Sequence, residues 1–122
     1  MAVILIVDDH ADSRWVLAHI VGRDRHTVLE AENGTQAIAL GRTRQPDLVL
    51  LDLFLPEKDG FETLKVLRSE LPKSRIIVVS AGWNVGDKDG LRIARELGAD
   101  VTLRKPVDLE AFRSAVTELL VA

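Results

Sequence analysis

The chain has 122 residues, which suits one domain with a single sizeable core and is too short for two ordinary domains. Hydrophobic residues make up 47% of the chain and charged residues 29%, a composition typical of a globular protein rather than a disordered one. The formal net charge of −3 and the scattered positions of Lys and Arg argue against direct nucleic-acid binding.

Cysteine is absent, which excludes disulfides and thiolate chemistry and fits a reducing compartment. No apolar run approaches the roughly 20 residues that span a bilayer, and the first residues lack a basic leader and a cleavage site. We therefore expect a cytoplasmic protein with no membrane partner.

Five short apolar runs predict strands in chain order, at residues 2–7, 27–31, 47–52, 75–80 and 100–103. Three of them are continuously apolar and rich in Val and Ile, which is typical of strands covered on both faces of a parallel sheet. Helical periodicity fills the segments between them, with apolar residues at spacings of three and four: Leu17, Ile20 and Val21; Leu64, Leu67 and Leu71; Leu109, Phe112, Val116, Leu119 and Leu120.

This alternation predicts an α/β fold: a single doubly wound (βα)5 domain over residues 1–122 with a parallel five-stranded sheet and right-handed crossovers. Ligands of such sheets bind beyond the carboxyl ends of the strands. Polar residues end or follow four of the predicted strands at that edge: Asp8 and Asp9, Asp52, Ser80, and Lys105.

Taken singly, most of these residues also suit structural roles. Asp8 and Asp9 fit a solvated turn at a helix start, Ser80 a hydroxyl bonded to backbone, and Lys105 a surface lysine. Asp52 is different, because it lies within an apolar run where an unpaired charge is costly. Their shared place at one sheet edge favours a joint functional role.

Three carboxylates at one edge repel one another unless a cation neutralises them. Oxygen ligands with room for water and phosphate oxygens favour Mg²⁺ over Ca²⁺. Lys105 would add a fixed positive charge, so a phosphoryl group between metal and lysine would be neutralised from two directions. A carboxylate can itself accept that group as an aspartyl phosphate, to which Ser80 can donate a hydrogen bond.

Five motifs in this order resemble the receiver domain of two-component response regulators, across the whole chain: "ILIVDD", "LLDLFLPEKDGFE", "VVSA", "LGAD" and "RKPVDLEAF". The resemblance implies the flavodoxin-like strand order 2-1-3-4-5, which would bring Asp8 and Asp9 beside Asp52.

Carried over by position, the resemblance implies that Asp52 accepts a phosphoryl group from a phosphohistidine on a histidine kinase or histidine phosphotransfer protein. Asp9, Asp52 and the backbone carbonyl of Phe54 would bind Mg²⁺ directly, with Asp8 acting through water. The protein would then catalyse only its own phosphorylation and slow dephosphorylation, and would signal to a downstream protein target or effector domain.

The resemblance further implies that Lys105 contacts the phosphoryl group, that the bond from Lys105 to Pro106 is cis, and that Ser80 is a switch hydroxyl. Thr102 stands where the family places a switch aromatic, three residues before the lysine. A threonine cannot fill the space that a moving hydroxyl vacates, so the usual coupling of hydroxyl and aromatic is in doubt.

The segment from Ser80 to Lys105 is about three residues longer than the family pattern. The additional residues fall around Gly82, Gly86 and Gly90, which weaken the start of the next helix. We hypothesise that output runs through ordering of this loop and helix, with Trp83 as the bulky moving part. A loop aromatic that only covers apolar surface is an equally good interpretation of Trp83.

Two other functions remain open at this point. One is a receiver-like interaction module with vestigial or atypical phosphorylation. Thr102 is compatible with this alternative, because it replaces the switch aromatic. The other is a phosphatase of the haloacid dehalogenase type, although Phe54 occupies the place where that family has a second aspartate. His10 is expected to be a helix-start residue near the metal. The chain ends directly after the last predicted helix, as expected for a stand-alone receiver or for a piece of a longer regulator or hybrid kinase, and Met1 favours the first.

Overall fold

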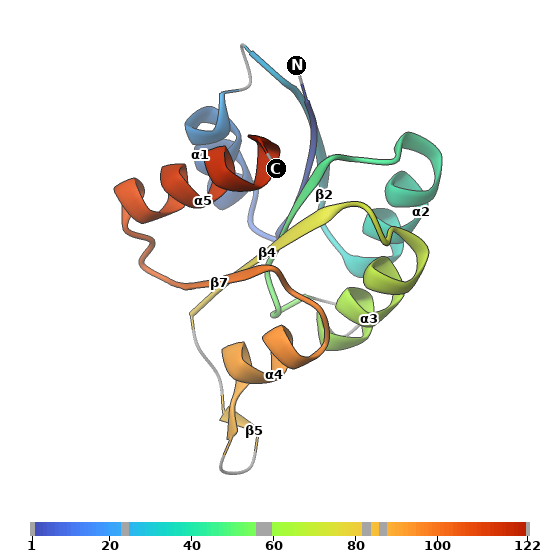
Figure 1. Cartoon of the computed structure of the whole chain (residues 1–122), viewed down its shortest axis with the longest axis vertical. Coiled ribbons are helices and arrows are strands. Elements are labelled where there is room, and N and C mark those ends of the chain that lie inside the picture. The colour runs from blue at the N-terminus through green and yellow to red at the C-terminus, as the bar shows by residue number, and fades with distance from the viewer. Residues whose placement is uncertain (1, 23–24, 56–59, 82–83, 86–87, 122) are drawn as a thin grey trace.

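The computed structural model describes residues 2–22, 25–55, 60–81, 84–85 and 88–121, and Figure 1 shows their arrangement. Each predicted strand is present to within one residue at either end. The elements are β1 (Val3–Val7), α1 (Ala11–Val21), β2 (Thr27–Ala31), α2 (Gly34–Arg44), β3 (Leu48–Leu51), α3 (Gly60–Glu70), β4 (Arg75–Ser80), β5 (Asn84–Val85), β6 (Lys88–Asp89), α4 (Gly90–Glu96), β7 (Val101–Arg104) and α5 (Leu109–Val121).

The five longer strands form one parallel sheet in the order β2-β1-β3-β4-β7. This is the predicted order 2-1-3-4-5, so the prediction of a doubly wound α/β fold is confirmed. Val7 at the end of β1 pairs with Leu51 at the end of β3. The chain therefore places Asp8 and Asp52, the next residues, side by side at the carboxyl edge of the sheet.

The sheet is covered on both faces, which explains why its strands are continuously apolar. Successive residues of a strand point to opposite faces. On one face, residues such as Ile4 and Ile6 pack with α1 and α5; on the other, Leu5 and Val7 pack with α2, α3 and α4. Figure 1 shows α1 beside α5, and α2 beside α3 on the other side of the sheet.

Two glycines allow the helices to approach closely. A Cβ on Gly60, the first residue of α3, would overlap the carbonyl oxygen of Leu53, so a larger residue there would displace the backbone that follows Asp52. Gly98 has a φ of +117°, which L residues rarely adopt, and a Cβ there would lie 2.5 Å from the Cδ of Arg68.

The segment after β4 contains a feature that the sequence did not predict, a short antiparallel hairpin of β5 and β6. It accommodates the additional residues before α4, which has only seven residues. Asp89 ends the hairpin, caps α4 by accepting a hydrogen bond from the backbone N–H of Leu91 (3.0 Å), and pairs with Nη2 of Arg104 (2.7 Å). Gly82, Trp83 and Gly86 lie outside the described residues, so the hypothesis about Trp83 stays a prediction.

Among the helices described here, not one combines the length and apolarity that crossing a membrane requires.

Candidate functional site

Asp8 is fully buried at the end of β1, and donors surround its carboxylate. Oδ1 accepts the backbone N–H of His10 (2.9 Å), and Oδ2 accepts the hydroxyl of Ser13 (2.7 Å) and the ammonium of Lys105 (3.3 Å). These donors explain how an acid can follow an apolar strand into the interior, because each offsets part of the cost of removing charge from water.

Asp9, the next residue, lies in a different environment. Its side chain is 33% exposed, and its Oδ1 lies 3.0 Å from Nδ1 of His10. The two adjacent carboxylates therefore differ in burial and in partners, so only Asp9 offers its oxygens to solvent.

Asp52 directly follows β3, and its side chain is only 8% exposed. Its Oδ1 accepts the backbone N–H of Phe54 (2.9 Å), while Oδ2 accepts Nζ of Lys105 (2.9 Å). The lysine thus lies between the carboxylates of Asp52 and Asp8, residues 53 and 97 positions away in sequence. We call Asp8, Asp9, Asp52 and Lys105 the acidic site.

Ser80 joins the site through the backbone, because its carbonyl accepts the N–H of Lys105 (2.8 Å). Its hydroxyl is buried and has no hydrogen-bond partner among the described residues. A buried hydroxyl without a partner is costly, so the interpretation of Ser80 as a hydroxyl bonded to backbone does not hold in this structure. The bond from Lys105 to Pro106 is cis, as the family resemblance implies.

Two residues that support the site were not found from the sequence. Ser13 donates to the carboxylate of Asp8, and Nη1 of Arg14 donates to the backbone carbonyl of Asp8 (2.8 Å) while its Nε pairs with Glu30 (3.0 Å). Both lie in the first turn and a half of α1. Sequence periodicity does not mark them, because they face the preceding loop rather than the core.

These contacts shift two pKa values in opposite directions. Burial alone would raise the pKa of Asp8, but hydrogen bonds from His10 and Ser13 and the charge of Lys105 outweigh it and lower that pKa. Burial alone would lower the pKa of Lys105, but its hydrogen bond and charge pairing with Asp52, and its pairing with Asp8, raise that pKa. Asp8 and Lys105 are therefore both charged at neutral pH.

The lowered pKa of Asp8 predicts how stability depends on pH. A carboxyl whose folded-state pKa lies below its unfolded value stabilises the fold above that unfolded value, about 3.9, and loses this contribution as pH falls further. In metal-free buffer, the free energy of unfolding of the wild type should fall below about pH 4 more steeply than that of Asp8→Asn. Asp12→Asn, which changes an exposed acid on α1, is the matched control. Equal slopes for wild type and Asp8→Asn in denaturant titrations would contradict this result.

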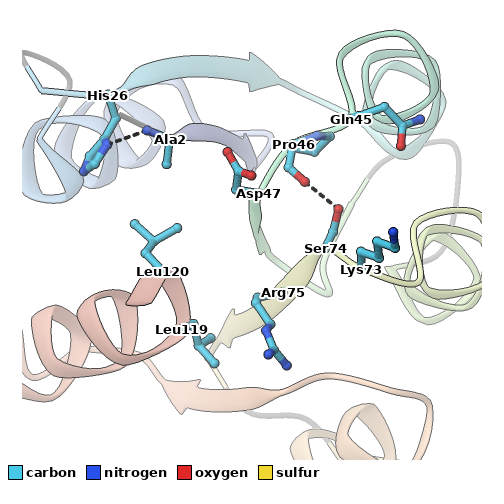
Figure 2. Close-up of a pocket in the computed structure, with 10 residues that line it drawn as sticks. All are labelled: Ala2, His26, Gln45, Pro46, Asp47, Lys73, Ser74, Arg75, Leu119 and Leu120. Atoms are coloured by element: carbon cyan, nitrogen blue, oxygen red, sulfur yellow. Dashed lines mark hydrogen bonds between the residues drawn. The ribbon is translucent and has the colours of Figure 1, made fainter. Parts of the chain in front are cut away.

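A cavity of about 510 Å³ lies at the opposite edge of the sheet, and Figure 2 shows its lining. Ala2, Asp47 and Arg75 place it at the amino ends of β1, β3 and β4. Two hydrogen bonds within the lining are structural: the backbone N–H of Ala2 donates to Nδ1 of His26, and Ser74 donates to the carbonyl of Pro46. The cavity is therefore separate from the acidic site.

The sequence matches the family model of the response regulator receiver domain over residues 4–117. The chain belongs to this family. Its relatives are signalling proteins of two-component systems, and receiver domains interact with histidine kinases and downstream effectors.

Among characterised relatives, the receiver is 36% identical to sporulation initiation phosphotransferase F of Bacillus subtilis, over 96% of this chain and 92% of that protein. It is 35% identical to protein PilH of Pseudomonas aeruginosa, over 98% of both chains. In other relatives the match is one part of a longer protein, as in the nitrate/nitrite response regulator protein NarL of Escherichia coli, of which this receiver covers 53%.

Solved structures agree on the fold. A CheY-like receiver domain protein from Methanospirillum hungatei has a TM-score of 0.88 at 24% identity, over 99% of this chain and 94% of that one. Chemotaxis protein CheY4 of Vibrio cholerae has a TM-score of 0.83 at 25% identity, over 98% and 99% of the two chains.

Receiver domains bind Mg²⁺ at an acidic cluster, and the residues of this receiver fit such an ion. In the described part of the chain, ligand atoms of Asp8, Asp9 and His10 lie within 4.8 Å of one another. Asp52 is not part of that group, but Lys105 links it to Asp8. Oxygen donors with one exposed carboxylate are suitable for a hard divalent ion that keeps some of its water.

Proposed function

We propose that this receiver takes a phosphoryl group from a phosphohistidine onto Asp52. The donor is a histidine kinase or a histidine phosphotransfer protein, and the signal passes to a downstream protein target or effector domain. The observation that carries the proposal is the placement of Lys105 Nζ against Asp52 (2.9 Å) and Asp8 (3.3 Å), because it puts a cation beside the acceptor carboxylate.

In the proposed step, a carboxylate oxygen of Asp52 attacks phosphorus and the P–N bond of the phosphohistidine breaks. The electron pair of that bond goes to the imidazole nitrogen, which then takes up a proton. Lys105 moves from pairing with a carboxylate to pairing with a phosphoryl oxygen, so its charge stays neutralised throughout. Asp9, Asp52 and the Phe54 carbonyl would hold Mg²⁺, with Asp8 acting through water, and the ion supplies positive charge to the phosphoryl oxygens.

Ser80 would provide the readout of the phosphorylated state. Its buried hydroxyl, which has no partner among the described residues, can donate to a phosphoryl oxygen. Thr102 lies on β7 opposite Val78 of β4, and it is too small to take the place of the hydroxyl when that moves. Ser80 is paired in the sheet with Arg104 of β7, so the signal would pass to Arg104, which pairs with Asp89 at the start of α4 (2.7 Å).

The proposal includes a cytoplasmic location and no catalysis beyond the receiver's own phosphorylation and slow dephosphorylation. The lack of cysteine supports the location, since such a chain needs no oxidising compartment.

Intact-mass spectrometry after incubation with Mg²⁺ and acetyl phosphate tests the proposal. The wild type should gain the mass of one phosphoryl group, and Asp52→Asn should gain none. Asp47→Asn, an exposed acid at the opposite sheet edge, should be phosphorylated like the wild type. No adduct in the wild type would favour the interaction module with vestigial phosphorylation, and continuous release of phosphate with repeated turnover would favour the phosphatase.

The two neighbouring acids should respond differently to removal. Both oxygens of Asp8 already accept protein donors, whereas Asp9 is 33% exposed, so Asp9 is the better direct ligand. Asp9→Ala should therefore reduce the rate of Mg²⁺-dependent phosphorylation more than Asp8→Ala does, by at least about tenfold, which corresponds to about 1.4 kcal/mol of transition-state stabilisation. The measurement is the initial rate of adduct formation at saturating Mg²⁺ in samples checked by circular dichroism. An equal loss in both variants, or a larger loss in folded Asp8→Ala, would reject the division of roles.

A further inference from the structure

His10 begins α1 but does not cap it. It is the N-cap residue, a position at which side chains usually accept a hydrogen bond from the first turn of the helix, and its side chain makes no such bond. The side chain is instead 76% exposed, with Nδ1 3.0 Å from Oδ1 of Asp9 and 3.6 Å from Oδ1 of Asp8. The imidazole therefore lies against the carboxylates of the acidic site without a role in the helix.

We propose that Nδ1 of His10 is a further ligand of the metal in the acidic site. The site of this receiver would then bind a borderline divalent ion, such as Co²⁺ or Zn²⁺, more tightly than carboxylates alone would. The inference deepens the proposed function, on which it rests, because it concerns the ion choice of that same site.

The distance between two of the proposed ligand atoms fits this assignment. Two neighbouring ligands that each lie about 2.1 Å from an octahedral ion are about 3.0 Å apart. This is the separation of Nδ1 of His10 and Oδ1 of Asp9, 3.0 Å. These two atoms could therefore bind the same ion without moving apart or closer together.

The chemistry of the donors sets the direction of the effect. A set of oxygens suits Mg²⁺, whereas one imidazole nitrogen in the set favours the later first-row ions over Mg²⁺. A plain ion pair between His10 and Asp9 is the alternative, and exposed pairs of that kind contribute little. If His10 and Asp9 form only an ion pair, removing His10 should change the affinities for hard and borderline ions by similar factors. The ratio of the Co²⁺ and Mg²⁺ affinities therefore distinguishes a metal ligand from an ion pair.

Isothermal titration of the full chain with CoCl₂ and with MgCl₂, for wild type, His10→Ala and His10→Gln, tests the proposal. Both variants should weaken Co²⁺ binding by about tenfold or more, since even outer partners of metal ligands are worth 10- to 100-fold in affinity. Their Mg²⁺ affinity should change far less, within about threefold. The visible absorption band of bound Co²⁺ should shift in both variants, because one nitrogen ligand is lost.

His19→Ala is the matched control, since His19 is an exposed histidine of α1 whose ring stacks on Trp15 at 5.6 Å. It should bind Co²⁺ as the wild type does. Equal Co²⁺ affinity in wild type and His10→Ala, or losses of Co²⁺ and Mg²⁺ affinity by the same factor, would overturn the proposal. Failure of the proposed function looks different, because it would appear as a wild type that gains no phosphoryl group with Mg²⁺ and acetyl phosphate.

Discussion

Replacing Lys105 with methionine should lower the free energy of unfolding by about 2 kcal/mol. The lysine is the cation that two buried carboxylates share, and removing one partner of a buried pair typically costs roughly 3–5 kcal/mol. We expect less than that range because the Lys105 side chain is 29% exposed. Denaturant unfolding in metal-free buffer at neutral pH measures the change.

A double-mutant cycle separates this electrostatic cost from lost packing. In an Asp52→Asn background the acceptor is neutral, so Lys105→Met should cost about 1 kcal/mol less than in the wild type. Lys65→Met on the exposed side of α3 is the control and should change stability by no more than about 0.5 kcal/mol. If Lys105→Met costs no more than this control, the lysine does not neutralise the site.

Installing a polar side chain at Phe54 should shorten the lifetime of the phosphorylated protein by about tenfold or more. Phe54 follows two residues after Asp52, is 41% exposed and holds the acceptor through its backbone N–H. Its phenyl ring cannot orient a water for attack on the phosphoryl group, whereas Asn or Glu can, and positioned acid–base groups contribute roughly 10²–10⁴-fold.

The decay of the phosphoprotein after removal of acetyl phosphate, followed by intact mass, gives the rate for Phe54→Asn, Phe54→Glu and Phe54→Leu. The leucine variant is the matched control, because it keeps an apolar side chain and the backbone N–H that Asp52 accepts. Its decay should stay close to that of the wild type. Equal decay in all four proteins would show that the side chain at this position does not govern hydrolysis.

The fold could be predicted closely, because its main determinants are local in sequence. Continuous apolar runs such as residues 48–51 and 76–79 reflect burial on both faces of a sheet, and helical periodicity between them requires parallel crossovers. Asp52 stood out for the same reason, as a charge in an apolar run. The structure shows which group stabilises the buried carboxylate of Asp52: the ammonium of Lys105 lies 2.9 Å from it.

The remaining features depend on contacts that no short motif encodes. Ser13 and Arg14 hold Asp8 from the start of α1, and His10 turns away from its helix toward Asp9. The hairpin of β5 and β6 has strands of only two residues, which are too short for an alternating pattern. Its last residue, Asp89, finds its partner Arg104 fifteen residues away. Such pairs become visible only in the folded structure.

The identity of the phosphorylated residue tests the account most directly. Borohydride reduces an aspartyl phosphate to homoserine with loss of phosphate, so peptide mass spectrometry after reduction locates the acceptor. For the protein phosphorylated with Mg²⁺ and acetyl phosphate, we predict homoserine at position 52 and unmodified aspartates at positions 8 and 9. Homoserine at Asp8 or Asp9, or homoserine nowhere in a protein that carries the phosphoryl mass, would contradict the central claim that Asp52 is the acceptor.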